Sequence, residues 1–234
     1  MIRRGMALAC ALAVSSCASS ARETHAATDR FVELYHELHP SIVFFTMEIP
    51  SDDPKAKGTW DEAYGTGIVV ESGAWGSRIL TDAHVVQDAR KIVAQIGDGR
   101  KAPARVIAVS NDSDDVAIVD TSLADMPVAP LGTARGLEPG EPIGVLGYPI
   151  PDAFADEHLG STVSLYTGRI ASIRKGSLEL DVPIIPGESG GPVFDKLTGN
   201  VIGIAESRFE EERAIGFATP IDTGIAFLAA HRRH

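Results

Sequence analysis

Near the start of the chain, apolar residues recur at the spacing of one face of an α-helix. They lie three or four residues apart: Phe31, Leu34, Tyr35 and Leu38. Thr28 stands where an N-cap is expected, and Pro40 should end the run because proline cannot continue a helix. This segment is predicted to form an N-terminal helix.

From residue 41 onward the pattern changes to short runs rich in β-branched residues, separated by turn residues such as Gly, Pro and Asp. Such runs predict β-strands. The first set spans residues 41–49, 67–71, 79–81, 91–96, 104–109 and 116–120. The second set spans residues 143–147, 162–173, 177–182, 192–194, 201–205 and 215–218. A stretch rich in Pro and Gly, residues 126–142, separates the two sets.

The absence of helices between these strands argues against a parallel sheet, whose strands need long crossover connections. We therefore predict an all-β protein in two six-stranded halves, either paired barrels or sandwiches. Residues 222–230 are predicted to form a short C-terminal helix.

The first 27 residues have the pattern of an export signal. Arginines close to Met1 precede an apolar or small run at residues 5–14, which is too short to span a bilayer, since a spanning helix needs about 20 residues. The run Val-Ser-Ser-Cys that ends at Cys17 resembles the lipobox of bacterial lipoproteins, and an ordinary cleaved signal is the alternative. We predict a signal peptide over residues 1–17, a linker over residues 18–27, and Cys17 as the candidate lipidation and membrane-attachment site.

Composition and charge restrict the class of function. The 234 residues carry a formal net charge of -11 and no basic block, so nucleic-acid binding is not expected. Both cysteines, Cys10 and Cys17, lie in the predicted signal, so the exported domain should fold without a disulfide. His36 and His39 lack further ligands for a metal, and residues 65–67 lack the third glycine of a dinucleotide loop. We expect neither metal nor cofactor.

Three polar residues beside predicted strands carry the candidate chemistry. His84 follows the strand in ILTDAHVV, Asp115 precedes the strand in SDDVAIVD, and Ser189 lies in the turn of PGESGGPVF. A serine hydroxyl becomes a good nucleophile when an imidazole accepts its proton and a carboxylate orients the imidazole. The order His, Asp, Ser along the chain is that of chymotrypsin-type enzymes. Asp112 and Asp114 compete for the third role, but Val-Ala-Ile-Val directly follows Asp115; a plain turn serine is the alternative for Ser189.

Seven segments in order resemble the trypsin-like serine proteases, and among them the HtrA (Deg) family. They are HPSIVFF, YGTGIVV, TDAHVV, DDVAIV, PIGVLGYP, PGESGGPVF and AIGFATPI. The resemblance begins at about Phe31 and covers nearly the whole chain after the signal. It implies a protease domain over residues 28–230 with two six-stranded antiparallel β-barrels, at about residues 41–125 and 126–221.

The resemblance also implies a role for each candidate residue. Ser189 would be the nucleophile, His84 the general base and then acid, and Asp115 the orienting carboxylate. The backbone N–H groups of Gly187 and Ser189 would form the oxyanion hole. The chain departs from the family at Glu188, where HtrA proteins usually carry asparagine, and this places a carboxylate beside that hole.

The residues expected to form the substrate pocket are largely apolar. They are Ile184, Ile185, Ile215, Gly216 and Phe217. Trypsin-type enzymes place an acid six residues before the nucleophile to receive Lys or Arg, and Pro183 stands at that position here. We therefore expect cleavage after small aliphatic residues, whereas Glu206 near the pocket rim is the residue that would favour Lys or Arg.

Together these features predict an exported serine endopeptidase that cleaves unfolded or misassembled proteins of the bacterial periplasm or cell envelope. The resemblance implies polypeptide substrates and, as a candidate assembly, a homotrimer. The chain ends soon after residue 222, so the PDZ domains common in the family are expected to be absent. Two alternatives stay open: a catalytically silent relative that binds polypeptides as a chaperone or scaffold, and a small-molecule esterase that uses the same site.

Overall fold

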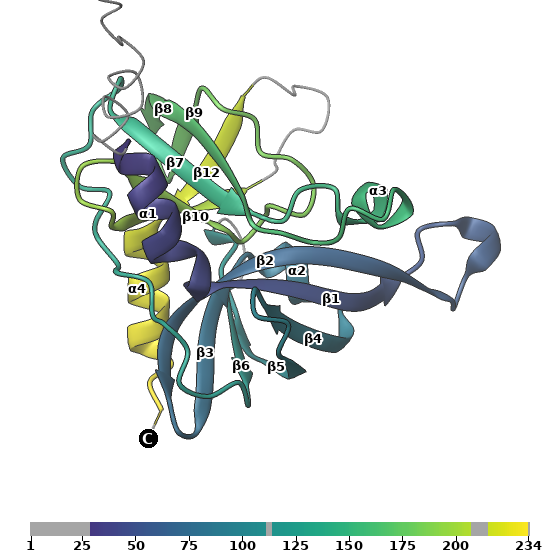
Figure 1. Cartoon of the computed structure of the whole chain (residues 1–234). Helices are drawn as coiled ribbons and strands as arrows, with labels where there is room; N and C mark the ends of the chain where they lie inside the picture. Colours follow the sequence, from purple (N-terminus) through teal and green to yellow (C-terminus); the bar gives the residue numbers. More distant parts are fainter. Residues whose placement is uncertain (1–28, 111–113, 207–214, 234) are drawn as a thin grey trace, which may run out of the picture.

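The computed structural model describes residues 29–110, 114–206 and 215–233. These residues form two closed β-barrels of six antiparallel strands each (Figure 1). A helix precedes the first barrel and another follows the second. The predicted fold class is therefore confirmed, and of the two architectures left open by the strand pattern, barrels are correct. The predicted signal peptide, linker and Cys17 lie outside the described residues and stay predictions.

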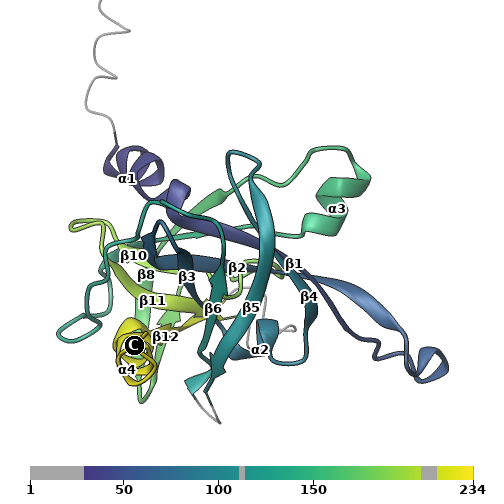
Figure 2. The same cartoon turned by 90° about the horizontal axis from the view of Figure 1, so that it is seen from below.

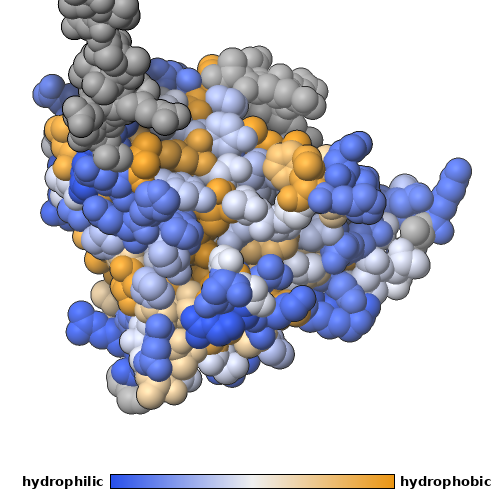
Figure 3. All heavy atoms as spheres, in the orientation of Figure 1, coloured by the Kyte–Doolittle hydropathy of each residue, from blue (hydrophilic) through white to orange (hydrophobic). Residues whose placement is uncertain are grey.

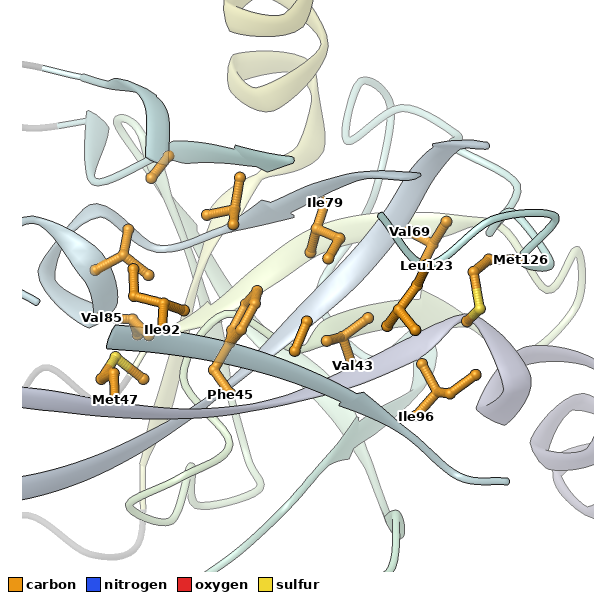
Figure 4. Close-up of a cluster of buried hydrophobic side chains, with 14 residues drawn as sticks. Val43, Phe45, Met47, Val69, Ile79, Val85, Ile92, Ile96, Leu123 and Met126 are labelled. Carbon is orange, nitrogen blue, oxygen red and sulfur yellow. The ribbon is translucent and has the colours of Figure 1, made fainter. Parts of the chain in front are cut away.

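The first barrel contains the six strands of the first predicted set. They are β1 (Ile42–Pro50), β2 (Trp60–Gly73), β3 (Gly76–Thr81), β4 (Arg90–Ile96), β5 (Lys101–Val109) and β6 (Ala117–Thr121). They pair in the order β1-β2-β3-β6-β5-β4, and β4 returns to β1. Figure 4 shows the buried side chains that fill the barrel, with Phe45 in the middle and Met47 and Met126 toward opposite ends. Alternate residues of β1 thus supply the core, as period-2 patterning requires.

The second barrel repeats this arrangement with the second predicted set. Its strands are β7 (Pro142–Gly147), β8 (Ser164–Arg174), β9 (Ser177–Leu180), β10 (Pro192–Asp195), β11 (Val201–Glu206) and β12 (Gly216–Pro220). They pair in the order β10-β11-β12-β9-β8-β7, and β7 pairs with β10 to close the barrel. Its core is aliphatic and includes Ile143, Val145 and Leu178.

The two predicted helices cover the junction between the barrels (Figures 1 and 2). Helix α1 (Arg30–Leu38) packs in a cluster that also holds Phe44 of β1 and Phe194 of β10. Helix α4 (Ile221–Ala230) contributes to a second cluster shared by both barrels. Asp29 caps α1, because its carboxylate accepts the Phe31 N–H at 3.1 Å. The predicted cap, Thr28, lies outside the described residues.

Short helical turns were absent from the sequence prediction. They are η2 (His39–Ser41), η3 (Pro54–Ala56), α2 (Ala83–Val86) and α3 (Pro151–Asp156). Such turns are too short to show a helical period, yet α2 carries His84 and α3 lies close to Gly187. Figure 1 also shows the long β1–β2 hairpin projecting from the first barrel, and Figure 3 shows mostly hydrophilic side chains over it. None of the helices in the described ranges is long and apolar enough to cross a membrane.

Candidate active site

His84 lies in the short helix that follows β3. The strand ends at Thr81, whose hydroxyl donates to the carbonyl of Thr66 at 2.7 Å, and the chain then turns into α2. The sequence predicted His84 at the end of a strand, whereas the structure places it in the helix that follows, after the strand has ended at Thr81. Its side chain is 43% exposed, so the ring is accessible to a substrate.

Asp115 holds His84 by two contacts. Its Oδ1 accepts the backbone N–H of His84 at 2.9 Å, and its Oδ2 lies 2.7 Å from the ring Nδ1. Asp115 has a φ of 44°, in the left-handed region that aspartate tolerates better than most residues. Of its two competitors, Asp114 is exposed, and Asp112 lies outside the described residues.

The pKa of Asp115 reflects two opposing effects. Burial raises the pKa of this carboxyl, but the hydrogen bond to the His84 ring, the histidine charge and the backbone N–H groups of α2 together lower it below its ordinary value. Asp115 is therefore a carboxylate at neutral pH. This is the charge state that can accept a hydrogen bond from Nδ1 and fix the ring tautomer.

The loop that carries Ser189 is bound to the first barrel beside His84. The backbone N–H of Thr66 donates to the Ser189 carbonyl at 2.9 Å, and the N–H of Gly190 donates to Oδ2 of Asp82 at 2.9 Å. Side-chain atoms of Asp82, His84 and Asp115 lie within 4.8 Å of one another. Gly190, the residue after Ser189, is thus hydrogen-bonded to Asp82, one member of this group. Ser189 itself is 6% exposed.

Gly187 has the conformation and the free N–H expected of an oxyanion donor. Its φ is +97°, and a Cβ there would lie 2.2 Å from the carbonyl oxygen of Tyr148. The Pro186 carbonyl accepts the N–H of Ile150 at 2.8 Å. Because C=O and N–H of one peptide unit point in opposite directions, the Gly187 N–H points away from Ile150. Within the described ranges, no acceptor takes this N–H.

Comparison with known proteins agrees with this geometry. Residues 65–204, which include His84, Asp115 and Ser189, match the family model described as a trypsin-like peptidase domain. The chain belongs to the trypsin-like peptidase family. It is 31% identical over 193 residues to the putative serine protease HhoB of Synechocystis, covering 77% of this chain and 42% of HhoB.

Another relative of this trypsin-like chain is a probable periplasmic serine endoprotease, DegP-like, of Halomonas elongata. It is 30% identical over 185 residues, covering 74% of this chain and 36% of the relative. The chain thus spans less than half the length of these two relatives. Among solved structures, the HtrA-type protease AlgW with a tripeptide superposes with a TM-score of 0.69 at 23% identity, covering 86% of this chain and 62% of AlgW. The serine endoprotease from Yersinia pestis gives 0.66 at 25% identity, covering 86% and 65%. The predicted resemblance to HtrA-type members is confirmed.

Glu188, the residue before Ser189, points into the protein. The residue is fully buried. Its Oε2 accepts the N–H of Ile185 at 2.8 Å, and among the described residues Oε1 has no hydrogen-bond partner. Burial raises the pKa of Glu188 to about 7, and the bond from Ile185 opposes this rise only in part.

Thr66 is a site residue that the sequence did not reveal. Its hydroxyl donates to the carbonyl of Gly187 at 2.7 Å and accepts the backbone N–H of Tyr148 at 3.2 Å. Thr66 is fully buried in β2, so these bonds join the first barrel to the catalytic loop of the second. The segment YGTGIVV was singled out for its glycines, and the threonine between them carried no separate signal.

Ile150 is the second residue that sequence reasoning missed. It has φ 36° and ψ 56°, a left-handed conformation that is strained for a β-branched side chain. Its N–H donates to the Pro186 carbonyl and thereby orients the peptide unit that also carries the Gly187 N–H. Two prolines flank it, Pro149 and Pro151. A residue before proline normally avoids helical conformations of either hand, so the sequence pointed to extended chain here.

The predicted substrate pocket is brought together in part. Ile184 is buried in the core of the second barrel, and a Cβ on Gly216 would lie 2.9 Å from its Cγ1. Ile185 and Phe217 are half-buried, and Ile215 is exposed. A cavity of about 330 Å³ adjoins Gly187 and is lined by residues 186–187, residues 62–64 of β2 and residues 150–153 at the start of α3.

Asp82, His84 and Asp115 are also the group that could hold a metal ion, as judged from the described residues. The two carboxylate oxygens of Asp115 already pair with the backbone N–H and with the ring Nδ1 of His84. Oδ2 of Asp82 accepts from Gly190. A cation would have to displace these contacts.

Proposed function

We propose that this chain is a serine endopeptidase that hydrolyses peptide bonds through Ser189, His84 and Asp115. The observation that supports this most directly is the paired contact of Asp115 with the backbone and the ring of His84. It leaves Nε2 of His84 as the nitrogen available to the substrate side. The attachment of Gly190 to Asp82 brings the Ser189 loop to the same place.

The chemistry follows from these positions. With Nδ1–H donated to Asp115, Nε2 can accept the proton of Ser189 Oγ as the oxygen attacks the scissile carbonyl. The resulting oxyanion would be bound by the N–H groups of Gly187 and Ser189, each donor lowering the barrier by roughly 3 kcal/mol. The protonated His84 then gives its proton to the leaving amine, and water completes the cycle through the acyl-enzyme.

The proposed substrates are polypeptides, and the proposed place of action is the cell envelope. Two kinds of relative support this: serine proteases of the HhoB type and DegP-like endoproteases named as periplasmic. Unfolded or misassembled chains suit an enzyme that must bind an extended backbone. The contact between Gly216 and Ile184 supports a shallow apolar pocket, and hence cleavage after small aliphatic residues.

Labelling with a fluorophosphonate probe tests the proposal, because the probe reacts with activated serines and hardly with turn serines. The folded chain should be labelled at Ser189 and should cleave casein. Ser189→Ala should abolish both, and His84→Ala should lower the rate by about 10⁶, since residues of a triad act as a unit. Asp115→Asn should lower kcat by about 10⁴ because it favours the wrong tautomer.

Asp114→Asn is the matched control, because Asp114 is exposed and lies beside Asp115 without contacting His84. This variant should retain the wild-type rate. A folded wild-type chain that is not labelled, together with an equally inert Glu188→Asn variant, would refute the enzyme and favour a silent relative that binds polypeptides.

A further inference from the structure

Glu188 connects both ends of the turn that carries the oxyanion donors. Its side chain accepts the N–H of Ile185 at 2.8 Å, while its own N–H donates to the Ile185 carbonyl at 2.9 Å. Its carbonyl accepts the N–H of Gly191 at 2.9 Å. Gly187 and Ser189, the two proposed donors, are its immediate neighbours in the chain. The Ser189 N–H belongs to the same peptide unit as the Glu188 carbonyl, so whatever holds Glu188 also sets the direction of this donor and holds the turn that carries Gly187.

The side chain is enclosed by the second barrel. A Cβ on Gly147 of β7 would lie 2.9 to 3.1 Å from the Cα, Cβ and Cγ of Glu188, so the glycine provides the room for this larger side chain. On β8, burial and, to a smaller extent, the nearby charge of Glu188 raise the pKa of the Tyr166 phenol. Within the described part of the chain, no Lys, Arg or His forms an ion pair with Glu188.

We propose that Glu188 is a positioning residue that holds the oxyanion turn through Ile185 and supports full activity in its neutral, protonated form. This inference rests on the proposed function, since the turn matters only if an oxyanion forms there. It gives Glu188, which stands where HtrA proteins usually carry asparagine, a role in the proposed reaction.

The neutral form is favoured by the surroundings of the carboxyl group. Oε1 is buried and has no partner among the described residues, and a buried charge without a partner is costly. The pKa of about 7 agrees with this, because burial disfavours the carboxylate. Below pH 7 the group is neutral; above it, a negative charge stands beside the position where the oxyanion develops. The carboxylate belongs to the residue between the two donors and is buried, and a like charge in such low-dielectric surroundings raises the barrier to forming the oxyanion, so activity should fall on the alkaline side.

The test compares wild type with Glu188→Gln from pH 6 to pH 9, using kcat/KM for a peptide substrate. Glutamine has the same shape, can accept from Ile185, and cannot ionise. Both enzymes share the titration of His84, which cancels in the ratio. The ratio of variant to wild type should rise by about tenfold between pH 6 and pH 9. A ratio that stays constant over this range would overturn the role of the neutral form.

Glu188→Ala tests the positioning role. It removes the acceptor of the Ile185 N–H, so kcat should fall by about tenfold or more at every pH while KM changes little. Glu188→Leu keeps most of the buried volume but cannot accept the Ile185 N–H, so it should be as slow as alanine, whereas glutamine should restore most of the loss. If the alanine variant matches the glutamine variant in kcat, the positioning role is wrong. Should the alanine variant fail to fold, the comparison of Glu188→Leu with Glu188→Gln decides the positioning role.

Fluorophosphonate labelling of Ser189, measured on the same samples, distinguishes failure of the proposed function from failure of the inference about Glu188. Wild type that is labelled but shows a constant ratio overturns only the inference about Glu188. Folded wild type that is not labelled at any pH refutes the proposed function and this inference with it.

Discussion

The hydroxyl of Thr66 is one of the direct links between the barrels at the active site, and Thr66→Val removes it with little change in shape. In the native structure this hydroxyl donates to the Gly187 carbonyl and accepts the N–H of Tyr148. Valine keeps the backbone bond from Thr66 N–H to the Ser189 carbonyl. The substitution therefore isolates the effect of the two side-chain bonds.

The expected loss of stability depends on whether water can reach the two groups that lose the hydroxyl, the Tyr148 N–H and the Gly187 carbonyl. Tyr148 is buried, so its N–H loses its acceptor without water to replace it, at a cost of about 1 to 3 kcal/mol. Gly187 is partly exposed, so its carbonyl can bind water, and only the net value of one bond, about 1 kcal/mol, is lost. We expect Thr66→Val to lower the free energy of unfolding by about 2 to 4 kcal/mol. The turn also loses a restraint next to its oxyanion donor, so kcat should fall.

Urea unfolding and steady-state kinetics measure these two effects, and Thr66→Ser is the matched control. Serine keeps both hydrogen bonds and loses one methyl group, which costs about 1 kcal/mol. The valine variant should thus be the less stable and the slower of the two. Equal free energies of unfolding and equal kcat for Val and Ser would show that packing of the methyl group, and not the hydroxyl, is what matters at Thr66.

Two further predictions concern the oxyanion turn and the substrate pocket. Gly187→Ala should lower kcat by about 10² to 10³, because a Cβ at φ +97° would lie 2.2 Å from the Tyr148 carbonyl and must displace the donor; wild-type kcat in a folded variant would contradict this. A peptide library should show cleavage after Val, Ala and other small aliphatic residues, and dominant cleavage after Lys or Arg would instead point to Glu206, which lies buried at the end of β11.

The strands could be predicted from the sequence because they form short runs rich in β-branched residues between turn residues, and several of them, such as β3 and β11, are buried along their whole length. All twelve strands of the structure overlap the predicted ranges. The longest difference is β2, which starts at Trp60, because its first residues pair with β1 in a hairpin whose side chains are exposed and lack the apolar signal. Exposed strands carry little of the pattern on which such predictions depend.

The candidate site was predictable where a residue's neighbours in the chain determined its surroundings. Asp115 could be chosen over Asp114 because an apolar strand follows it, and the structure places Asp115 against His84. Thr66 and Ile150 could not be found this way, because their contacts are to Gly187 and Pro186 in another part of the chain. The direction of the Glu188 side chain was likewise open, since it depends on the room beside Gly147.

The hydrogen bonds that fasten the Ser189 loop run from one barrel to the other, so the site depends on both halves of the chain being folded. Thr66 and Gly187 are 121 positions apart in sequence, and Asp82 and Gly190 are 108 apart. Neither half of the protein would contain a working site by itself, because the proposed general base, His84, comes from the first barrel and the proposed nucleophile, Ser189, from the second. If Ser189 and His84 act as proposed, a chain still being synthesised cannot hydrolyse peptide bonds before both barrels have folded and docked.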